Sequence, residues 1–281
     1  MLFKIKCKFS HYENGFPVVD VTVSDDKGSA TIPVNVKRLL TADNTKTRKG
    51  EKRGFLTMGL SMSPHKTAGL GNVCTSAGLC IETCLDETGL GSVFRSIHAY
   101  RAAKTWLWFN DRKLFWEILE TDLARATRKA DRENLELAFR PNMFSDNQYE
   151  KFPAFRKLLD RFPGAHPYDY TKHHKRMFSS SRPDKYHLTY SRSEKRDRQA
   201  VDCLEAGFNV AVVFNHDENH LPRFWNSFPV QNGSENDIRF IDPPATVIGL
   251  PMKYGRIKQA HRMLETGFAV TDPSCKPMIV A

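Results

Sequence analysis

From residue 55 onward, short apolar runs alternate with longer segments of helical periodicity, and this alternation constrains the fold most strongly. The runs have the length and the β-branched and aromatic content of strands. They are predicted at Leu56–Met62, Leu135–Arg140, His166–Thr171, His187–Arg192, Asn209–Phe214 and Thr246–Met252. Strands that alternate with helices pair in parallel through right-handed crossovers. The sequence therefore predicts an α/β protein.

Three intervening segments are predicted to be helices. Ser92 is expected to cap the first, Asp111 the second, and the third covers Glu194–Ala206 and ends at Gly207. Six strands joined in this way favour a TIM-like or partial (β/α) barrel. The linker Lys172–Lys185 leaves little room for a covering helix, so a doubly wound open sheet is the alternative.

The N-terminal part has a different pattern of apolar and polar residues, without helical periodicity. Residues 1–36 alternate apolar and polar side chains in short runs, divided by turn signals at Asn14-Gly15 and Asp25–Gly28. Residues 41–54 are polar and without periodicity, which predicts a mobile loop. We therefore expect a β-rich segment over residues 1–54 and the barrel-like α/β domain over residues 55–281.

Composition limits the setting in which the chain works. The 281 residues are 40% hydrophobic, and no stretch approaches the roughly 18–20 apolar residues of a membrane span. The start, Met-Leu-Phe-Lys-Ile-Lys, does not read as a secretory signal. A cytosolic protein is expected, and reduced cytosolic cysteines favour metal or redox roles over disulfides.

Three of the six cysteines lie within eleven residues, as Cys74, Cys80 and Cys84. Their Cys-x5-Cys-x3-Cys spacing lacks the Cys-x2-Cys pairs of structural zinc sites. Three thiolates in one glycine-containing, aliphatic loop suit a [4Fe–4S] cluster whose fourth iron stays open to water, a substrate or a remote residue. Zinc, or three buried cysteines without a metal, are the alternatives. We also assign cofactor binding to His65, Gly71 and Asn72.

Polar residues follow several of the predicted strands. Because active sites of parallel α/β sheets gather at the carboxyl ends of strands, these residues are expected to share one rim with the cysteines. The candidate catalytic residues on this rim are Arg140, Asp146, Asp169, Lys172 and Arg192, with Ser191 and His65 beside them. The basic ones favour an anionic small molecule.

Several motifs in the chain resemble the phage gene product 88 family. They include Leu60-Ser-Met-Ser-Pro-His65, Gly71-Asn-Val-Cys74, Gly78-Leu-Cys80, Ala99-x-Arg101-x-x-Lys104-Thr105, Pro167–Lys172, His187–Glu194 and Asp237–Asp242. The resemblance implies a bacteriophage origin and expression in the cytoplasm of an infected bacterium, and it implies no activity. The chain departs from the family pattern at Thr75, where relatives carry proline, and at Pro141, where they carry leucine.

The layout also resembles radical S-adenosylmethionine enzymes, which place a three-cysteine loop after the first strand of a partial barrel. The usual loop there is Cys-x3-Cys-x2-Cys, so the analogy supports a redox-capable cluster but does not establish S-adenosylmethionine as a cofactor. Our leading hypothesis is an iron–sulfur protein that performs reductive or radical chemistry on a small anionic molecule, with an electron donor as partner.

Two other hypotheses belong to different classes. The net charge of +10 and the basic segments Lys37–Arg53 and Lys172–Arg198 allow a nucleic-acid-binding protein with a structural zinc or no metal. The third hypothesis is a structural or host-modulating protein, in which the cluster only stabilises the folded chain. The sequence determines neither the substrate nor the oligomeric state.

Overall fold

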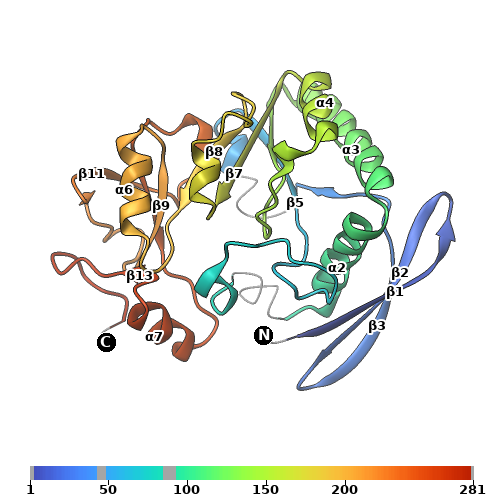
Figure 1. Cartoon of the computed structure of the whole chain (residues 1–281), viewed down its shortest axis with the longest axis horizontal. Helices are drawn as coiled ribbons and strands as arrows, with labels where there is room; N and C mark the ends of the chain where they lie inside the picture. The colour runs from blue at the N-terminus through green and yellow to red at the C-terminus, as the bar shows by residue number, and fades with distance from the viewer. Residues whose placement is uncertain (1–2, 43–48, 85–92, 280–281) are drawn as a thin grey trace.

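The structure is a computed structural model that describes residues 3–42, 49–84 and 93–279 (Figure 1). At its N-terminus, β1 (Lys4–Glu13), β2 (Phe16–Asp25) and β3 (Gly28–Asn35) form an antiparallel meander. The first turn is built by Asn14 and Gly15, both with positive φ, which is the backbone that a tight hairpin requires. The predicted N-terminal strands and their turns are therefore confirmed. Residues 43–48 of the predicted mobile loop lie outside the described residues.

A second, ten-stranded sheet holds the rest of the chain together. Its order is β10-β11-β12-β9-β8-β7-β6-β5-β4, with β13 beside β9, and the pairs from β5 to β11 are parallel. The strands are β4 (Leu40–Thr41), β5 (Phe55–Leu60), β6 (Glu136–Arg140), β7 (Ala165–Thr171), β8 (His187–Ser191), β9 (Val210–Phe214), β10 (Phe224–Trp225), β11 (Phe228–Asn232), β12 (Val247–Pro251) and β13 (Ala269–Val270). All six predicted strands are present, with ends that differ by two residues at most.

The mixed α/β class is confirmed, whereas closure into a barrel is not. In the described part of the chain the order is linear, and the antiparallel strands β4 and β10 form its two ends. The sheet also splits at β9. Strand β8 pairs with its first half, at Val210 and Ala211, and β13 pairs with its second half, at Val213 and Phe214. Strand β8 thus diverges from β9 toward its carboxyl end and opens space there.

Helices connect most of the parallel strands, and α2 (Arg95–Asn110) lies beside the N-terminal meander (Figure 1). The other helices are α3 (Arg112–Glu133), α4 (Pro153–Arg161), α5 (His174–Met177), α6 (Asp197–Glu205) and α7 (Ile257–Glu265). Helix α3 begins as predicted, because the Asp111 carboxylate accepts a hydrogen bond from the Leu114 N–H at 3.0 Å. Helix α6 starts three residues later than predicted and ends before Gly207, whose φ is +85°. Ser92 lies outside the described residues, and α4, α5 and α7 were not predicted, although α5 is a single turn within the linker Lys172–Lys185.

The main hydrophobic core lies between the sheet and helices α2 to α6, and it extends into the N-terminal meander; α7 packs in a separate cluster with Met252 and Phe268. Val19 and Val21 of β2 share this core with Ala99 and Ala102 of α2. The β-rich segment and the α/β part are therefore packed through one continuous core. The opposite face of the sheet is covered by residues 236–242, which include the short 3-10 helix η5 (Arg239–Ile241) and bring Ile238 against Tyr168 and Ala138.

Candidate functional site

The carboxyl ends of the parallel strands surround a cavity of about 930 Å³. This volume suits a small-molecule ligand, because ligand pockets in proteins commonly enclose about 300–1,000 Å³. Residues that follow β5, β6, β7, β8, β9, β11 and β12 line it, together with the loop that carries the three cysteines. The rim predicted from the strand ends is therefore a real cavity wall.

Most of the predicted site residues meet there. Those lining the cavity are His65, Cys74, Cys80, Cys84, Arg140, Asp146, Lys172 and Ser191. Four others do not line it, namely Gly71, Asn72, Asp169 and Arg192. Three of these four, Asn72, Asp169 and Arg192, are hydrogen-bonded to residues that do line it, as described below.

The first cysteine has a defined setting. The Cys74 sulfur accepts a hydrogen bond from the His65 backbone N–H at 3.3 Å and faces the Phe144 carbonyl oxygen at 3.5 Å. His65 adopts φ = +50°, a left-handed backbone that turns its N–H toward the sulfur. The Asn72 side-chain oxygen accepts the Cys74 N–H at 2.8 Å. Burial raises the pKa of the Cys74 thiol to about 12, so this thiol is protonated at neutral pH.

The other two cysteines line the same cavity without completing a ligand set. Cys80 lies on the 3-10 helix η1 (Gly78–Ile81) and packs against an apolar cluster that contains Met252 and Phe268. Within residues 3–42, 49–84 and 93–279, no three His, Cys, Asp or Glu side chains are grouped closely enough to hold a metal ion. In this arrangement the three sulfurs are not gathered into one ligand group, so no reaction step is assigned through a cluster.

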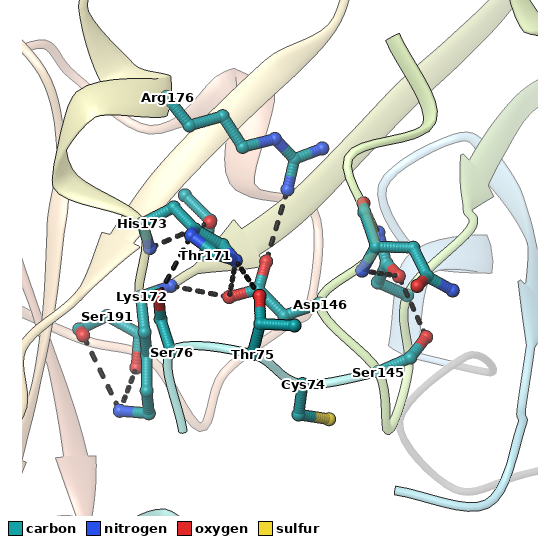
Figure 2. A network of polar contacts seen from close by, with 12 residues as sticks. Cys74, Thr75, Ser76, Ser145, Asp146, Thr171, Lys172, His173, Arg176 and Ser191 are labelled. Atoms are coloured by element: carbon teal, nitrogen blue, oxygen red, sulfur yellow. Dashed lines mark hydrogen bonds and ion pairs between the residues drawn. The ribbon is translucent and has the colours of Figure 1, made fainter. Parts of the chain in front are cut away.

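Asp146 joins the cysteine loop to two strand ends (Figure 2). Its backbone N–H donates to the Val73 carbonyl at 2.7 Å, and its carboxylate accepts the Lys172 backbone N–H at 2.8 Å. The same carboxylate accepts from the Arg176 guanidinium at 3.2 Å. Arg176 in turn makes two 2.8 Å bonds to the buried Glu150. Asp146 thus acts as a junction that fixes the spacing between the loop, β6 and β7.

His173 holds the cysteine loop from the other side. Its two ring nitrogens lie 2.8 Å from the Ser76 hydroxyl and 3.1 Å from the Thr75 hydroxyl, as Figure 2 shows. Glu194 adds a further anchor, because its carboxylate accepts the Leu79 N–H at 2.9 Å. Neither anchor was predicted. Glu194 does lie in a motif shared with the resembling family, whereas His173 sits in a polar stretch without any distinguishing signal.

Asp169 supports the cavity from behind. It is fully buried and accepts two 2.8 Å hydrogen bonds from Asn142, one from the backbone N–H and one from the side-chain amide, and a third from the Tyr186 hydroxyl. Burial raises the pKa of this carboxyl to about 6, although the Tyr186 bond and Arg176 act in the opposite direction. Asp169 thus does not line the cavity itself but positions Asn142, which does, and its catalytic role stays a prediction.

The remaining predicted residues have structural contacts. Arg192 donates to the Gly267 and Phe268 carbonyls at 2.7 and 3.0 Å, and so fills the split between β8 and β9. Gly71 leaves no room for a side chain, because a Cβ there would lie 2.2 Å from the Phe109 ring. Arg140 does line the cavity, with one terminal nitrogen bound to Asp237 at 2.8 Å.

Three of the cations proposed for nucleic-acid binding are buried, whereas most of the described ones in the two segments are exposed or half-buried. In the segment Lys172–Arg198, the side chains of Lys172, Arg176 and Arg192 are buried. Lys37–Arg53 includes residues 43–48, which lie outside the described residues, and its Arg53 lies 3.7 Å from Glu235. Nucleic-acid binding stays a prediction, and the burial of these three cations weakens it because only solvent-facing charges can reach phosphates.

The fold and the cavity define the class of this protein: an open, mainly parallel α/β sheet with a ligand-sized pocket at its carboxyl edge and a cysteine-bearing loop as one wall. The family model described as Gene product 88 matches residues 37–267, so the chain belongs to the phage gene product 88 family. No curated protein and no solved structure shows a significant match. In the described part of the chain, no helix has the length and apolar character needed to cross a membrane.

Proposed function

We propose that this protein is an iron–sulfur protein that acts on a small anionic molecule in the cytoplasm of an infected bacterium. In this proposal Cys74, Cys80 and Cys84 hold a [4Fe–4S] cluster at the cavity. The observation that carries it is that all three cysteines of the loop line one cavity, whereas Cys7 and Cys203 do not. Because the loop and the strand ends line the same cavity, a metal centre held by the loop would face a molecule bound there.

The order of the sheet supports the same idea. Strands β5, β6, β7, β8, β9 and β12 lie side by side in chain order and are parallel, and the cysteine loop follows the first of them. We propose that these six strands form a partial barrel of the kind that radical S-adenosylmethionine enzymes use. S-adenosylmethionine is accordingly one small molecule to test at this site. The resemblance is one of layout alone, which is an associational argument.

The local chemistry of Cys74 also suits such a ligand. The His65 N–H bond to sulfur stabilises a thiolate, and hydrogen bonds of this kind tune cluster potentials. A protonated, buried thiol loses its proton when a metal binds it. Binding of a cluster would require the loop to move so that the three sulfurs converge. When bound, the cluster would supply one-electron chemistry; the residues of the chain would bind and orient the substrate.

Anaerobic purification with iron and sulfide analysis tests the proposal. We expect four irons and four sulfides per chain, broad visible absorption, and an electron paramagnetic resonance signal after reduction. Cys74→Ala, Cys80→Ala and Cys84→Ala should each lower the bound iron strongly. Cys7→Ala is the matched control, because Cys7 is also a half-buried cysteine whose thiol pKa is raised by burial, to about 11.

Two outcomes would contradict the proposal. One is a colourless protein with stoichiometric zinc, and the other is iron that persists in all three loop variants. Thermal unfolding of Cys84→Ala separates a reactive site from a structural staple. If the cluster only stabilises the folded chain, this variant unfolds. If the cluster takes part in a reaction, the variant stays folded but loses its iron.

A further inference from the structure

One cation at the floor of the cavity has an unusual environment. The Lys172 side chain is 8% exposed and lines the cavity. Its ammonium group reaches only neutral oxygens: the Ser191 hydroxyl at 3.2 Å, the Arg192 carbonyl at 3.3 Å and the Ser191 carbonyl at 3.5 Å. All three contacts are longer than the 2.7–2.9 Å of charge-assisted bonds. A buried ammonium held this loosely keeps most of its capacity to bind an anion.

The neighbouring carboxylates do not neutralise this charge by direct contact. Among the described residues, no carboxylate lies within 4 Å of the Lys172 ammonium nitrogen. Glu194 interacts with Lys172 electrostatically, but its oxygens are hydrogen-bonded to the Leu79 N–H and the Ser193 hydroxyl. Asp146 binds the backbone N–H of Lys172 and the Arg176 guanidinium. Burying a charge without a partner of opposite charge costs free energy, so a bound anion would offset this cost by pairing with the Lys172 ammonium.

The wall next to this ammonium is apolar. Phe268, Met252 and Met263 line the cavity and belong to one hydrophobic cluster. The ammonium nitrogen lies 5.1 Å from the centre of the Phe268 ring, within the range of a cation–π contact. Methionine side chains adapt to flat or irregular apolar ligands and make favourable contacts with aromatic rings. The cationic floor and the apolar wall therefore meet at Lys172.

We infer that the cavity binds an organic anion whose carboxylate or phosphate sits on Lys172 and whose adjacent apolar group packs against Phe268, Met252 and Met263. This inference deepens the proposed function by naming the class of small molecule, and it rests on that function only for the reaction that follows binding. Neither a bare inorganic anion nor a neutral apolar molecule satisfies both surfaces. Affinity should therefore require the two features in one molecule.

Isothermal titration of the full chain with small probes tests the inference. The probes are phenyl phosphate and phenylacetate as aromatic anions, inorganic phosphate as the anion alone, and benzyl alcohol as the neutral aromatic. We expect one aromatic anion or both to bind at least about tenfold more tightly than either partial probe, since loss of an ionic or an aromatic contact costs about 1.4 kcal/mol or more. Comparison of the two aromatic anions decides between phosphate and carboxylate.

Two variants locate the binding. Lys172→Met keeps the length of the side chain and should abolish the preference for aromatic anions over benzyl alcohol. Lys175→Met is the matched control, because Lys175 is exposed and does not line the cavity. Phe268→Leu should weaken the binding of aromatic anions and leave that of inorganic phosphate unchanged. Thermal unfolding of each variant shows whether it is folded.

The inference is overturned if inorganic phosphate binds as tightly as the aromatic anions, if benzyl alcohol binds most tightly, if Lys172→Met retains the preference, or if no probe binds at millimolar concentration. These results do not depend on iron. The titrations use protein with and without reconstituted cluster, so a failure of ligand binding is distinguishable from a failure of cluster binding.

Discussion

The buried ion pair between Arg176 and Glu150 offers the sharpest test of how the cavity is held together. The side chains of Arg176 and Glu150 are 1% and 2% exposed, and two parallel hydrogen bonds of 2.8 Å join them. In Arg176→Met, Glu150 becomes a buried charge without a partner, and Asp146 and Tyr186 each lose a donor. Removing one member of a buried pair costs about 3–5 kcal/mol. We expect a loss in this range from the free energy of unfolding.

Urea unfolding at pH 7, followed by tryptophan fluorescence, measures this loss. Arg176→Met combined with Glu150→Leu should regain a large part of it, because the second change removes the uncompensated charge. Lys113→Met is the control: it breaks a solvent-exposed pair with Glu117, at 4.0 Å, and should leave the free energy of unfolding within experimental error. A loss below about 1 kcal/mol for Arg176→Met, with an unchanged dependence on urea, would refute the assignment of a buried, mutually dependent network.

Three further predictions concern the same site. Because burial raises the folded-state pKa of Asp169 to about 6 from an ordinary 3.8, the folded protein binds this proton more tightly, and the free energy of unfolding should fall by about 3 kcal/mol in total as pH rises from about 3 to 7. Urea unfolding should show this fall reduced in Asp169→Asn. Gly78→Ala should lower the free energy of unfolding by about 1–2 kcal/mol, since Gly78 has φ = +54° and a Cβ there would lie 2.5 Å from the Glu194 carboxylate. The same change should speed thiol labelling of Cys80. Gly164→Ala is the control, because a Cβ there meets nothing within 4 Å, and it should leave both measurements unchanged. Ferrous iron affinity should weaken as pH falls, because the Cys74 thiol with its pKa of about 12 must release a proton, and Cys74→Ala should show a shallower slope than Cys7→Ala.

The motifs shared with the gene product 88 family now have physical explanations. Thr105 accepts the Ser63 N–H at 2.9 Å and so anchors the chain just after β5. Lys104 is buried and donates to the Leu39 carbonyl at 2.7 Å; burial lowers its pKa to about 8. Arg239, in the motif Asp237–Asp242, is fully buried and pairs with Asp242 at 3.3 Å. These polar residues build the interior that supports the cavity.

Local patterns in the sequence predicted the strands because strand formation depends on nearby side chains. They also predicted the shared rim, since parallel strands connected by right-handed crossovers must end on the same edge. Helix α4 (Pro153–Arg161) was missed because the residues that cap it, Phe152 and Phe162, carry none of the polar or glycine signals that mark helix ends. The sequence could not tell that Asp169 does not line the cavity, because a polar residue near a strand end looks the same whether it faces the cavity or lies behind its wall.

The sequence by itself determined the α/β class of the fold, the parallel pairing of its strands and the gathering of the cysteine loop with Arg140, Asp146 and Lys172 at one edge. Only the tertiary structure decided which charges are buried, because Arg176 meets Glu150 across 26 positions of the chain and a basic run gives no sign of such a partner. It likewise decided the linear order of the described strands and placed Lys172 beside Phe268 in the cavity wall, since both depend on contacts between segments far apart in sequence.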